Sequence, residues 1–131
     1  MIMDSNDQNK EQVGKNRHFL GALGHAHDGL RFALHHERNF RFQLAMVPLL
    51  GALGLYLGLK PTEWALLALA CGLVLLAELF NTSVEWLCDL VVGDHFHPLV
   101  KTIKDVAAGT VLLMTLVAIF VGFVIFGSYI L

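Results

Sequence analysis

The feature that most constrains this chain is its last apolar segment, which carries no charged residue from Val106 onward. In lipid a backbone must satisfy its own hydrogen bonds, and a helix of about 20 apolar residues crosses the roughly 30 Å hydrocarbon layer. The segment therefore predicts a membrane-spanning helix over residues 105–128. Residues 40–59 and 64–92 have a similar character, so we expect an all-α integral membrane protein with three transmembrane helices.

Composition and cysteine spacing narrow the class further. Hydrophobic residues make up 56% of the chain and charged residues 15%, which is too apolar for an ordinary soluble domain. The net charge of −2 and the lack of a basic stripe argue against nucleic acid as a partner. Cys71 and Cys88 lie several turns apart on the second expected span, which rules out a disulfide between them within one chain. No cleavable signal peptide is apparent before the first span.

The N-terminal part of the chain has a different pattern. Residues 1–16 are polar and predict a disordered tail, and residues 17–131 are expected to form a single membrane domain. Over about residues 17–36, apolar side chains recur at three- and four-residue steps, the pattern of an amphipathic helix. We expect this helix to lie on the inner membrane surface. The alternative is a short soluble helix that packs on the loops.

Basic residues predict the orientation of the spans. Most of them precede the first span, Lys101 and Lys104 fall in the expected loop of residues 93–104, and Lys60 lies between the first two spans. The positive-inside rule then places the N-terminus and the 93–104 loop in the cytoplasm and the C-terminus outside. The end of the second span that carries acidic residues would face the cytoplasm, where ATP is available.

The stretch AELFNTSVEWLCDL places polar residues at that end of the second span. At 3.6 residues per turn, Glu78, Glu85 and Asp89 fall within an arc of about 40°. Thr82 lies beside them and Asn81 at the margin. Ionisable groups at membrane depth are costly and usually face a bundle interior or a hydrated cavity. We therefore expect one polar site on this face; the alternative for each acid alone is a solvated position at the interface.

The residue types on this face suit phosphate chemistry. Two carboxylates and an asparagine provide the oxygen ligands that Mg²⁺ prefers, often together with substrate phosphates. A third carboxylate could accept a proton from an attacking hydroxyl. The seven histidines are weaker metal candidates, because none lies inside an expected span and no zinc-site spacing is present. Gly54 and Gly58 form a small-xxx-small pair, which permits close helix packing and fits a homo-oligomer.

Three stretches also carry a resemblance to a known family. These are ELFNTSVEWLCD, GLRFALHHERNFRFQL at residues 29–44, and HPLVKTIKDVAAGTVLL at residues 97–113. In order and spacing they resemble the signature, the N-terminal motif and the Lys-Asp motif of the prokaryotic diacylglycerol kinase family. This family consists of small three-span membrane kinases and includes the undecaprenol kinases. The similarity covers roughly residues 19–126.

The resemblance implies a kinase that transfers the γ-phosphate of ATP, with Mg²⁺, to the hydroxyl of a membrane lipid. Diacylglycerol and undecaprenol are the expected acceptors, and the HPLVKTIKD stretch is more similar to the undecaprenol-type branch. Glu78, which matches the first acid of the signature, is expected to be the general base. Asn81 is expected to orient the reacting groups.

The remaining expected site residues concern the nucleotide and its metal. Glu85 and Glu37 match family positions that hold the Mg²⁺ accompanying ATP. Lys104 and Asp105 match the nucleotide-binding pair, and they are expected at the N-terminus of the third span, where the helix dipole favours an anion. Asp89 matches the final acid of the signature and is assigned only to support of the site.

Family members are trimers with sites between subunits, so the resemblance implies a homotrimer in the bacterial inner membrane with its site at the cytoplasmic face. Two departures from the family pattern, Phe80 and the run Trp86-Leu87-Cys88, alter packing beside the site without removing a polar group. The rival interpretation is a non-enzymatic ion- or proton-conducting membrane subunit, in which the acids of the second span form a relay.

Overall fold

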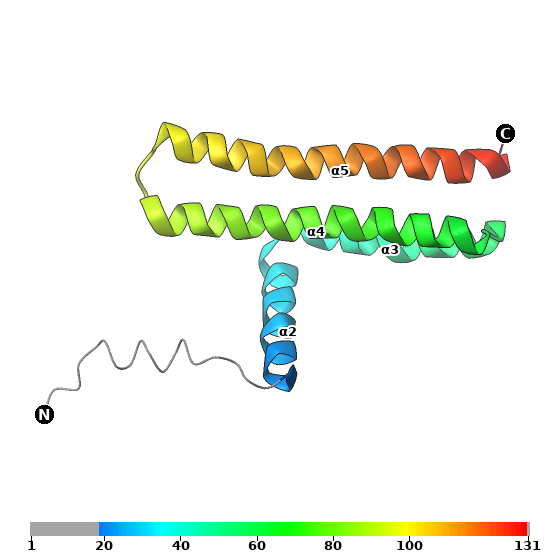
Figure 1. Ribbon diagram of the computed structural model, residues 1–131, viewed down its shortest axis with the longest axis horizontal. Coiled ribbons are helices and arrows are strands. Elements are labelled where there is room, and N and C mark those ends of the chain that lie inside the picture. Colours follow the sequence, from blue (N-terminus) through cyan, green and yellow to red (C-terminus); the bar gives the residue numbers. More distant parts are fainter. Residues whose placement is uncertain (1–18, 131) are drawn as a thin grey trace, which may run out of the picture. The chain divides into compact units, whose positions relative to one another are not determined.

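The computed structural model describes residues 19–130, which form four helices: α2 (Phe19–His36), α3 (Arg38–Leu57), α4 (Pro61–Val92) and α5 (Pro98–Ile130) (Figure 1). The expected tail at residues 1–16 lies outside the described residues. The chain divides into two units between Phe32 and Ala33, and helices α3, α4 and α5 belong to the second unit. Helices α3, α4 and α5 are each long and apolar enough to cross a membrane, which confirms the predicted all-α class.

The third long helix begins earlier than predicted. Residues 98–104 were expected to belong largely to a loop, but α5 starts at Pro98. Proline is well suited to the first helical position, and the Nδ1 atom of His97 accepts a hydrogen bond of 3.2 Å from the N–H of Leu99. Lys101 and Lys104 therefore lie within the helix. The prediction that Lys104 is beside the free N–H groups of the helix start is wrong.

Glycine shapes the turn between α3 and α4. Gly58 adopts φ 71° and ψ 47°, a left-handed conformation that ends α3. The N–H of Gly58 bonds to Leu55 O at 3.3 Å and that of Leu59 to Gly54 O at 3.1 Å, which together form a Schellman motif. A Cβ on Gly54 would lie 2.8 Å from Trp64. The small-xxx-small pair thus serves a close turn within one chain.

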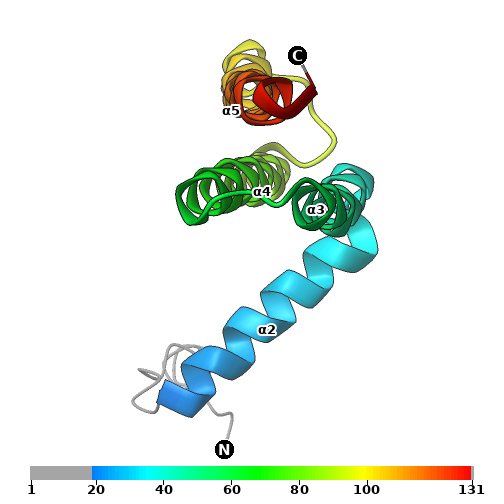
Figure 2. The ribbon, with the colours of Figure 1, turned by 90° about the vertical axis from the view of Figure 1, so that its right-hand side faces the viewer.

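The three long helices pack as an elongated group. Helices α4 and α5 run antiparallel beside each other, and α3 packs along α4 (Figures 1 and 2). A small apolar core of Leu59, Leu67 and Ile125 lies towards the α3–α4 turn. At the same end, the hydroxyl of Tyr129 donates a hydrogen bond of 2.6 Å to Glu63, which ties the last turn of α5 to the first turn of α4.

The outer faces of these helices are apolar. Leu55 and Tyr56 on α3 and Phe120 and Phe123 on α5 are among the large hydrophobic side chains left exposed. Surfaces of this kind are suited to lipid or to neighbouring copies rather than to water. Both cysteines, which lie on α4, are free, as expected from their spacing.

Candidate active site

Three polar side chains within one turn of α4 are buried. Glu78 is 2% exposed, Thr82 7% and Asn81 9%, and they are the buried polar or charged residues within the described part of the chain. They lie on one continuous helix, so the turn from Glu78 to Thr82 brings all three to the inner face. The polar face predicted from the sequence is confirmed for these residues. Asn81, which was expected at its margin, is as buried as the others.

Glu78 is held by a residue from another helix. The Nε2 atom of Gln43, on α3, donates a hydrogen bond of 3.1 Å to Oε2 of Glu78. The side chain of Asn39, one turn earlier on α3, also interacts with Glu78. Gln43 was assigned no role from the sequence. The available signal was an amide inside an apolar span, which requires a hydrogen-bond partner at that depth.

A second hydrogen bond extends the polar face along α4. The Nδ2 atom of Asn81 donates to Oε1 of Glu85 at 2.9 Å, one turn further on. Three buried side-chain atoms nearby have no hydrogen-bond partner within the described chain: Oε1 of Gln43, Oδ1 of Asn81 and Oγ1 of Thr82. Buried polar atoms without partners are rare in proteins, so they mark a place where a partner from outside the chain is expected.

Two ion pairs lie near the end of the α4 polar face that is distant from the apolar core. The Nζ atom of Lys104 contacts Oδ1 of Asp89 at 2.5 Å, which joins α5 to α4. Lys101 contacts Asp105 at 2.5 Å along α5, and both side chains are more than half exposed. Of the two predicted nucleotide-binding residues, Lys104 thus contacts the polar face of α4, and Asp105 pairs with a lysine of its own helix.

Carboxylates gather around Glu78 without forming a closed metal cluster. Glu37, the residue that precedes α3, and Glu85 lie close enough to Glu78 for their charges to repel it. Within the described residues, no group of three or more His, Cys, Asp or Glu side chains is placed to hold a metal ion.

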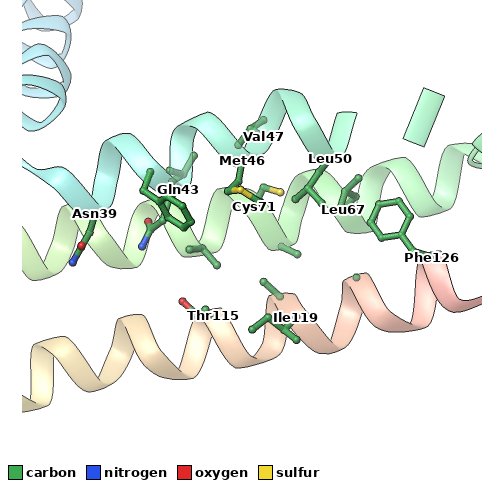
Figure 3. Close-up of a pocket in the computed structure, with 16 residues that line it drawn as sticks. Asn39, Gln43, Met46, Val47, Leu50, Leu67, Cys71, Thr115, Ile119 and Phe126 are labelled. Carbon is green, nitrogen blue, oxygen red and sulfur yellow. The ribbon is translucent and has the colours of Figure 1, made fainter. Parts of the chain in front are cut away.

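An apolar cavity opens beside Glu78. It has a volume of about 490 Å³ and lies between α3, α4 and α5. Asn39 and Gln43 line it near one end and Phe126 near the other, with Met46, Cys71 and Ile119 between them (Figure 3). Gln43 both lines the cavity and bonds to Glu78, so the carboxylate lies one side chain away from the cavity wall. A hydrocarbon chain is the kind of ligand that such walls accept.

The fold and the site define a small membrane protein of three long apolar helices, with a buried carboxylate bonded to a residue that lines an apolar cavity. The chain matches the prokaryotic diacylglycerol kinase family over residues 24–126. It is 36% identical to the undecaprenol kinase of Bacillus subtilis (strain 168) over 124 residues, which are 95% of this chain and 97% of that protein.

Two further relatives are diacylglycerol kinases. That of Synechocystis sp. (strain ATCC 27184 / PCC 6803 / Kazusa) is 40% identical over 116 residues, 88% of this chain and 65% of the relative. That of Escherichia coli (strain K12) is 29% identical over 100 residues, 76% of this chain and 81% of the relative. The chain belongs to the prokaryotic diacylglycerol kinase family and is a lipid kinase. Membership of an enzyme family replaces the ion-conducting interpretation.

Proposed function

We propose that this chain is an ATP-dependent kinase that phosphorylates the hydroxyl of a membrane lipid, with Glu78 as the general base. The observation that carries the proposal is the position of Glu78, which is 2% exposed and is held by a residue that lines the apolar cavity. A lipid chain in the cavity would bring its hydroxyl to a carboxylate that is shielded from water. Diacylglycerol and undecaprenol, for which the relatives are named, are the proposed acceptors.

In the proposed reaction, Glu78 accepts the proton of the lipid hydroxyl as the lipid oxygen forms a bond to the γ-phosphorus. The bond between that phosphorus and the bridging oxygen of ADP breaks. Asn81, which already bonds Glu85, orients the reacting groups. Lys104 places positive charge beside the phosphates, and Asp105 supports nucleotide binding. Phosphoryl transfer relies mainly on positioning and on neutralisation of charge, both of which fixed groups of this kind can supply.

Mg²⁺ fits the donor atoms around Glu78. Glu37 and Glu85 offer carboxylate oxygens, and the Oδ1 atom of Asn81 is a buried acceptor without a partner in the described chain. These are oxygen ligands of the kind that Mg²⁺ takes together with substrate phosphates. We assign Glu37 and Glu85 to the metal, which when bound would neutralise charge on the transferred phosphate.

The assembly and its orientation are part of the same proposal. We propose a homotrimer in the bacterial inner membrane, with an amphipathic helix at residues 17–36 on the cytoplasmic surface and residues 17–131 as one domain. The resemblance to the family supports the trimer, and the distribution of basic residues supports a cytoplasmic N-terminus and a cytoplasmic active site. The apolar outer faces of α3 and α5 are compatible with contacts between copies.

The proposal is tested with the full chain reconstituted in lipid vesicles and supplied with γ-labelled ATP and Mg²⁺. Diacylglycerol and undecaprenol are offered separately, and label is followed into the organic phase. Glu78→Gln should lower the rate by about 10²- to 10⁴-fold, since it removes the base but keeps the side-chain shape. Glu63→Gln is the matched control, because it changes a carboxylate on the same helix at the far end from the site.

Each outcome has a distinct meaning. Label in one lipid identifies the acceptor, and label in both shows that the cavity does not discriminate between them. Absence of label in either lipid from folded wild-type protein would remove both proposed acceptors. A Glu78→Gln variant with the wild-type rate would remove Glu78 from the role of base while leaving the kinase activity in place.

A further inference from the structure

The Thr82 hydroxyl is buried without a partner in the described chain, unlike several other hydroxyl groups on these helices. Four others donate to backbone carbonyl oxygens of the preceding turn, at distances of 2.6 to 3.1 Å: Ser83, Thr102, Thr110 and Ser128. Thr82 makes no such bond, although its place inside α4 offers the same carbonyl groups. Its Oγ1 atom is fully buried and has no partner within the described chain.

The stability of the chain does not account for this hydroxyl. A buried hydroxyl without a partner loses its hydrogen bonds to water and gains none in return, so it disfavours folding. Valine has nearly the same shape and would fill the position without that loss. A threonine that is 7% exposed and unpaired is therefore expected to meet a partner that the isolated chain lacks.

The position of Thr82 indicates where that partner lies. With a rise of 1.5 Å per residue, Thr82 is roughly 6 Å along the helix axis from Glu78 and roughly 4.5 Å from Glu85. It is therefore located between the proposed base and the end of α4 where Lys104 pairs with Asp89. A phosphoryl group that passes from the nucleotide to the lipid oxygen has to cross this interval.

The chemistry of the three unpaired atoms selects Thr82. Oε1 of Gln43 and Oδ1 of Asn81 are carbonyl oxygens and can only accept hydrogen bonds, whereas the Thr82 hydroxyl can donate one. The non-bridging oxygens of a phosphoryl group are acceptors. Thr82 is thus the one of the three that can bind them.

We infer that Thr82 is a further catalytic residue, whose hydroxyl donates a hydrogen bond to a non-bridging oxygen of the phosphoryl group during its transfer. The inference rests on the proposed function. The bonds that form and break are those given above: the lipid oxygen bonds to phosphorus, the ADP oxygen leaves, and the lipid proton goes to Glu78. Thr82 keeps its own proton throughout and strengthens its bond as charge on the phosphoryl oxygens is redistributed.

The test compares Thr82→Val, Thr82→Ser and Ser83→Ala in the reconstituted full-length protein. Thr82→Val removes the hydroxyl and keeps the shape, and Thr82→Ser restores the donor. Ser83→Ala is the matched control, because it removes a neighbouring hydroxyl that already bonds Leu79 O. We expect Thr82→Val to lower kcat by about 10- to 100-fold, with the KM values for ATP and lipid changed less than about twofold. Thr82→Ser and Ser83→Ala should stay within about threefold of the wild type.

Thermal unfolding and oligomeric state are measured on the same preparations. A catalytic hydroxyl predicts that Thr82→Val unfolds at the same temperature as the wild type or higher, because an unpaired buried hydroxyl has been removed. The inference is overturned if Thr82→Val keeps the wild-type kcat, or if it loses activity only together with its oligomeric state, which would make the hydroxyl a contact between copies. If Thr82→Val does not fold, Thr82→Ala is judged by the same criteria.

The proposed function and this inference fail differently. Wild-type protein that transfers no phosphate removes the proposed function. Wild-type protein that is active, with an inactive Glu78→Gln variant and a fully active Thr82→Val variant, removes only the role of Thr82.

Discussion

The side-chain amide of Gln43 donates a hydrogen bond of 3.1 Å to Oε2 of Glu78, and this bond joins α3 to α4 beside the apolar cavity. Gln43 lines the cavity, and Glu78 is among the most buried side chains of the described chain. Gln43 therefore connects the proposed binding site of the lipid chain with the proposed base. Both the direction of the Glu78 carboxylate and the entry of the lipid hydroxyl should depend on it.

Replacement of Gln43 by leucine should separate the two roles of this residue, as part of the cavity wall and as a hydrogen-bond donor to Glu78. Gln43→Leu keeps an apolar wall for the cavity but removes the hydrogen bond from Gln43 to Glu78, so the carboxylate is held less firmly toward the lipid hydroxyl. We expect kcat/KM for the lipid to fall about 10-fold or more, with KM for ATP unchanged. The measurement is steady-state transfer with the lipid concentration varied at saturating ATP.

Met46→Leu provides the control for this experiment, since Met46 lines the same cavity and is apolar in both forms. That variant should stay close to the wild-type rate. An equal loss in Met46→Leu and Gln43→Leu would show that the cavity wall, and not the bond to Glu78, sets the rate.

The ion pair of Lys104 and Asp89 provides a second prediction. The Nζ atom of Lys104 lies 2.5 Å from Oδ1 of Asp89 on α4. Lys104 can exchange this partner for a phosphate when a nucleotide binds. Lys104→Gln should raise KM for ATP by about 10-fold or more and leave KM for the lipid unchanged, because it removes a positive charge from the nucleotide site alone. Steady-state kinetics with ATP varied, at two salt concentrations, measure this.

Lys101→Gln is the matched control for Lys104. Lys101 lies on the same helix and forms its own ion pair, but its partner Asp105 is on α5 and both are largely solvent-exposed. Exposed ion pairs contribute little, so Lys101→Gln should change KM for ATP by less than about twofold. A change as large as that of Lys104→Gln would mean that the nucleotide also contacts Lys101.

Gly54 is predicted to be essential for the close turn between α3 and α4. A Cβ at this position would meet the Trp64 ring at 2.8 Å and the Leu59 side chain at 2.9 Å. Gly54→Ala should therefore lower the free energy of unfolding by about 1 to 3 kcal/mol through overpacking. Gly51→Ala, one turn earlier and with no atom within 4 Å of the added Cβ, should be neutral or stabilising. Unfolding of both variants in detergent decides the point, and equal stabilities would contradict it.

The sequence could predict those parts of the site that depend on a single helix. Hydropathy and length define the three spans, and the 3.6-residue period places Glu78 and Thr82 on one face of α4. Both properties belong to single helices and need no knowledge of their neighbours. For the same reason, the periodicity predicts that polar side chains share a face but not which residue of another helix meets them.

Gln43 shows this limit. An amide early in an apolar span predicts that Gln43 has a hydrogen-bond partner, but the sequence does not indicate that this partner is Glu78. That contact depends on the register of α3 against α4, which is set by the Gly58 turn and the packing of Gly54 on Trp64.

The start of α5 shows a second limit. Pro98 and the charged residues after it resemble a loop by composition, so the span was expected to begin near residue 105. In the structure a proline at the first helical position and the ion pair of Lys101 with Asp105 are compatible with a helix that extends beyond the apolar run. Hydropathy defines the part of a helix that lies in lipid and does not define where the helix itself begins.

The last prediction concerns the end of the molecule opposite the candidate site. The Tyr129 hydroxyl donates to Oε2 of Glu63 at 2.6 Å, and the same oxygen accepts the N–H of Lys60 at 2.7 Å. One carboxylate thus fastens the end of α5 and the start of α4. Tyr129→Phe removes the first bond and keeps the ring, so it should lower the midpoint of thermal unfolding while kcat and both KM values stay at wild-type levels. Glu63→Gln weakens both bonds and should lower the midpoint further. Thermal unfolding and initial rates measured on one reconstituted preparation test this, and a loss of kcat at an unchanged midpoint would show that this end of the helices acts on the distant site.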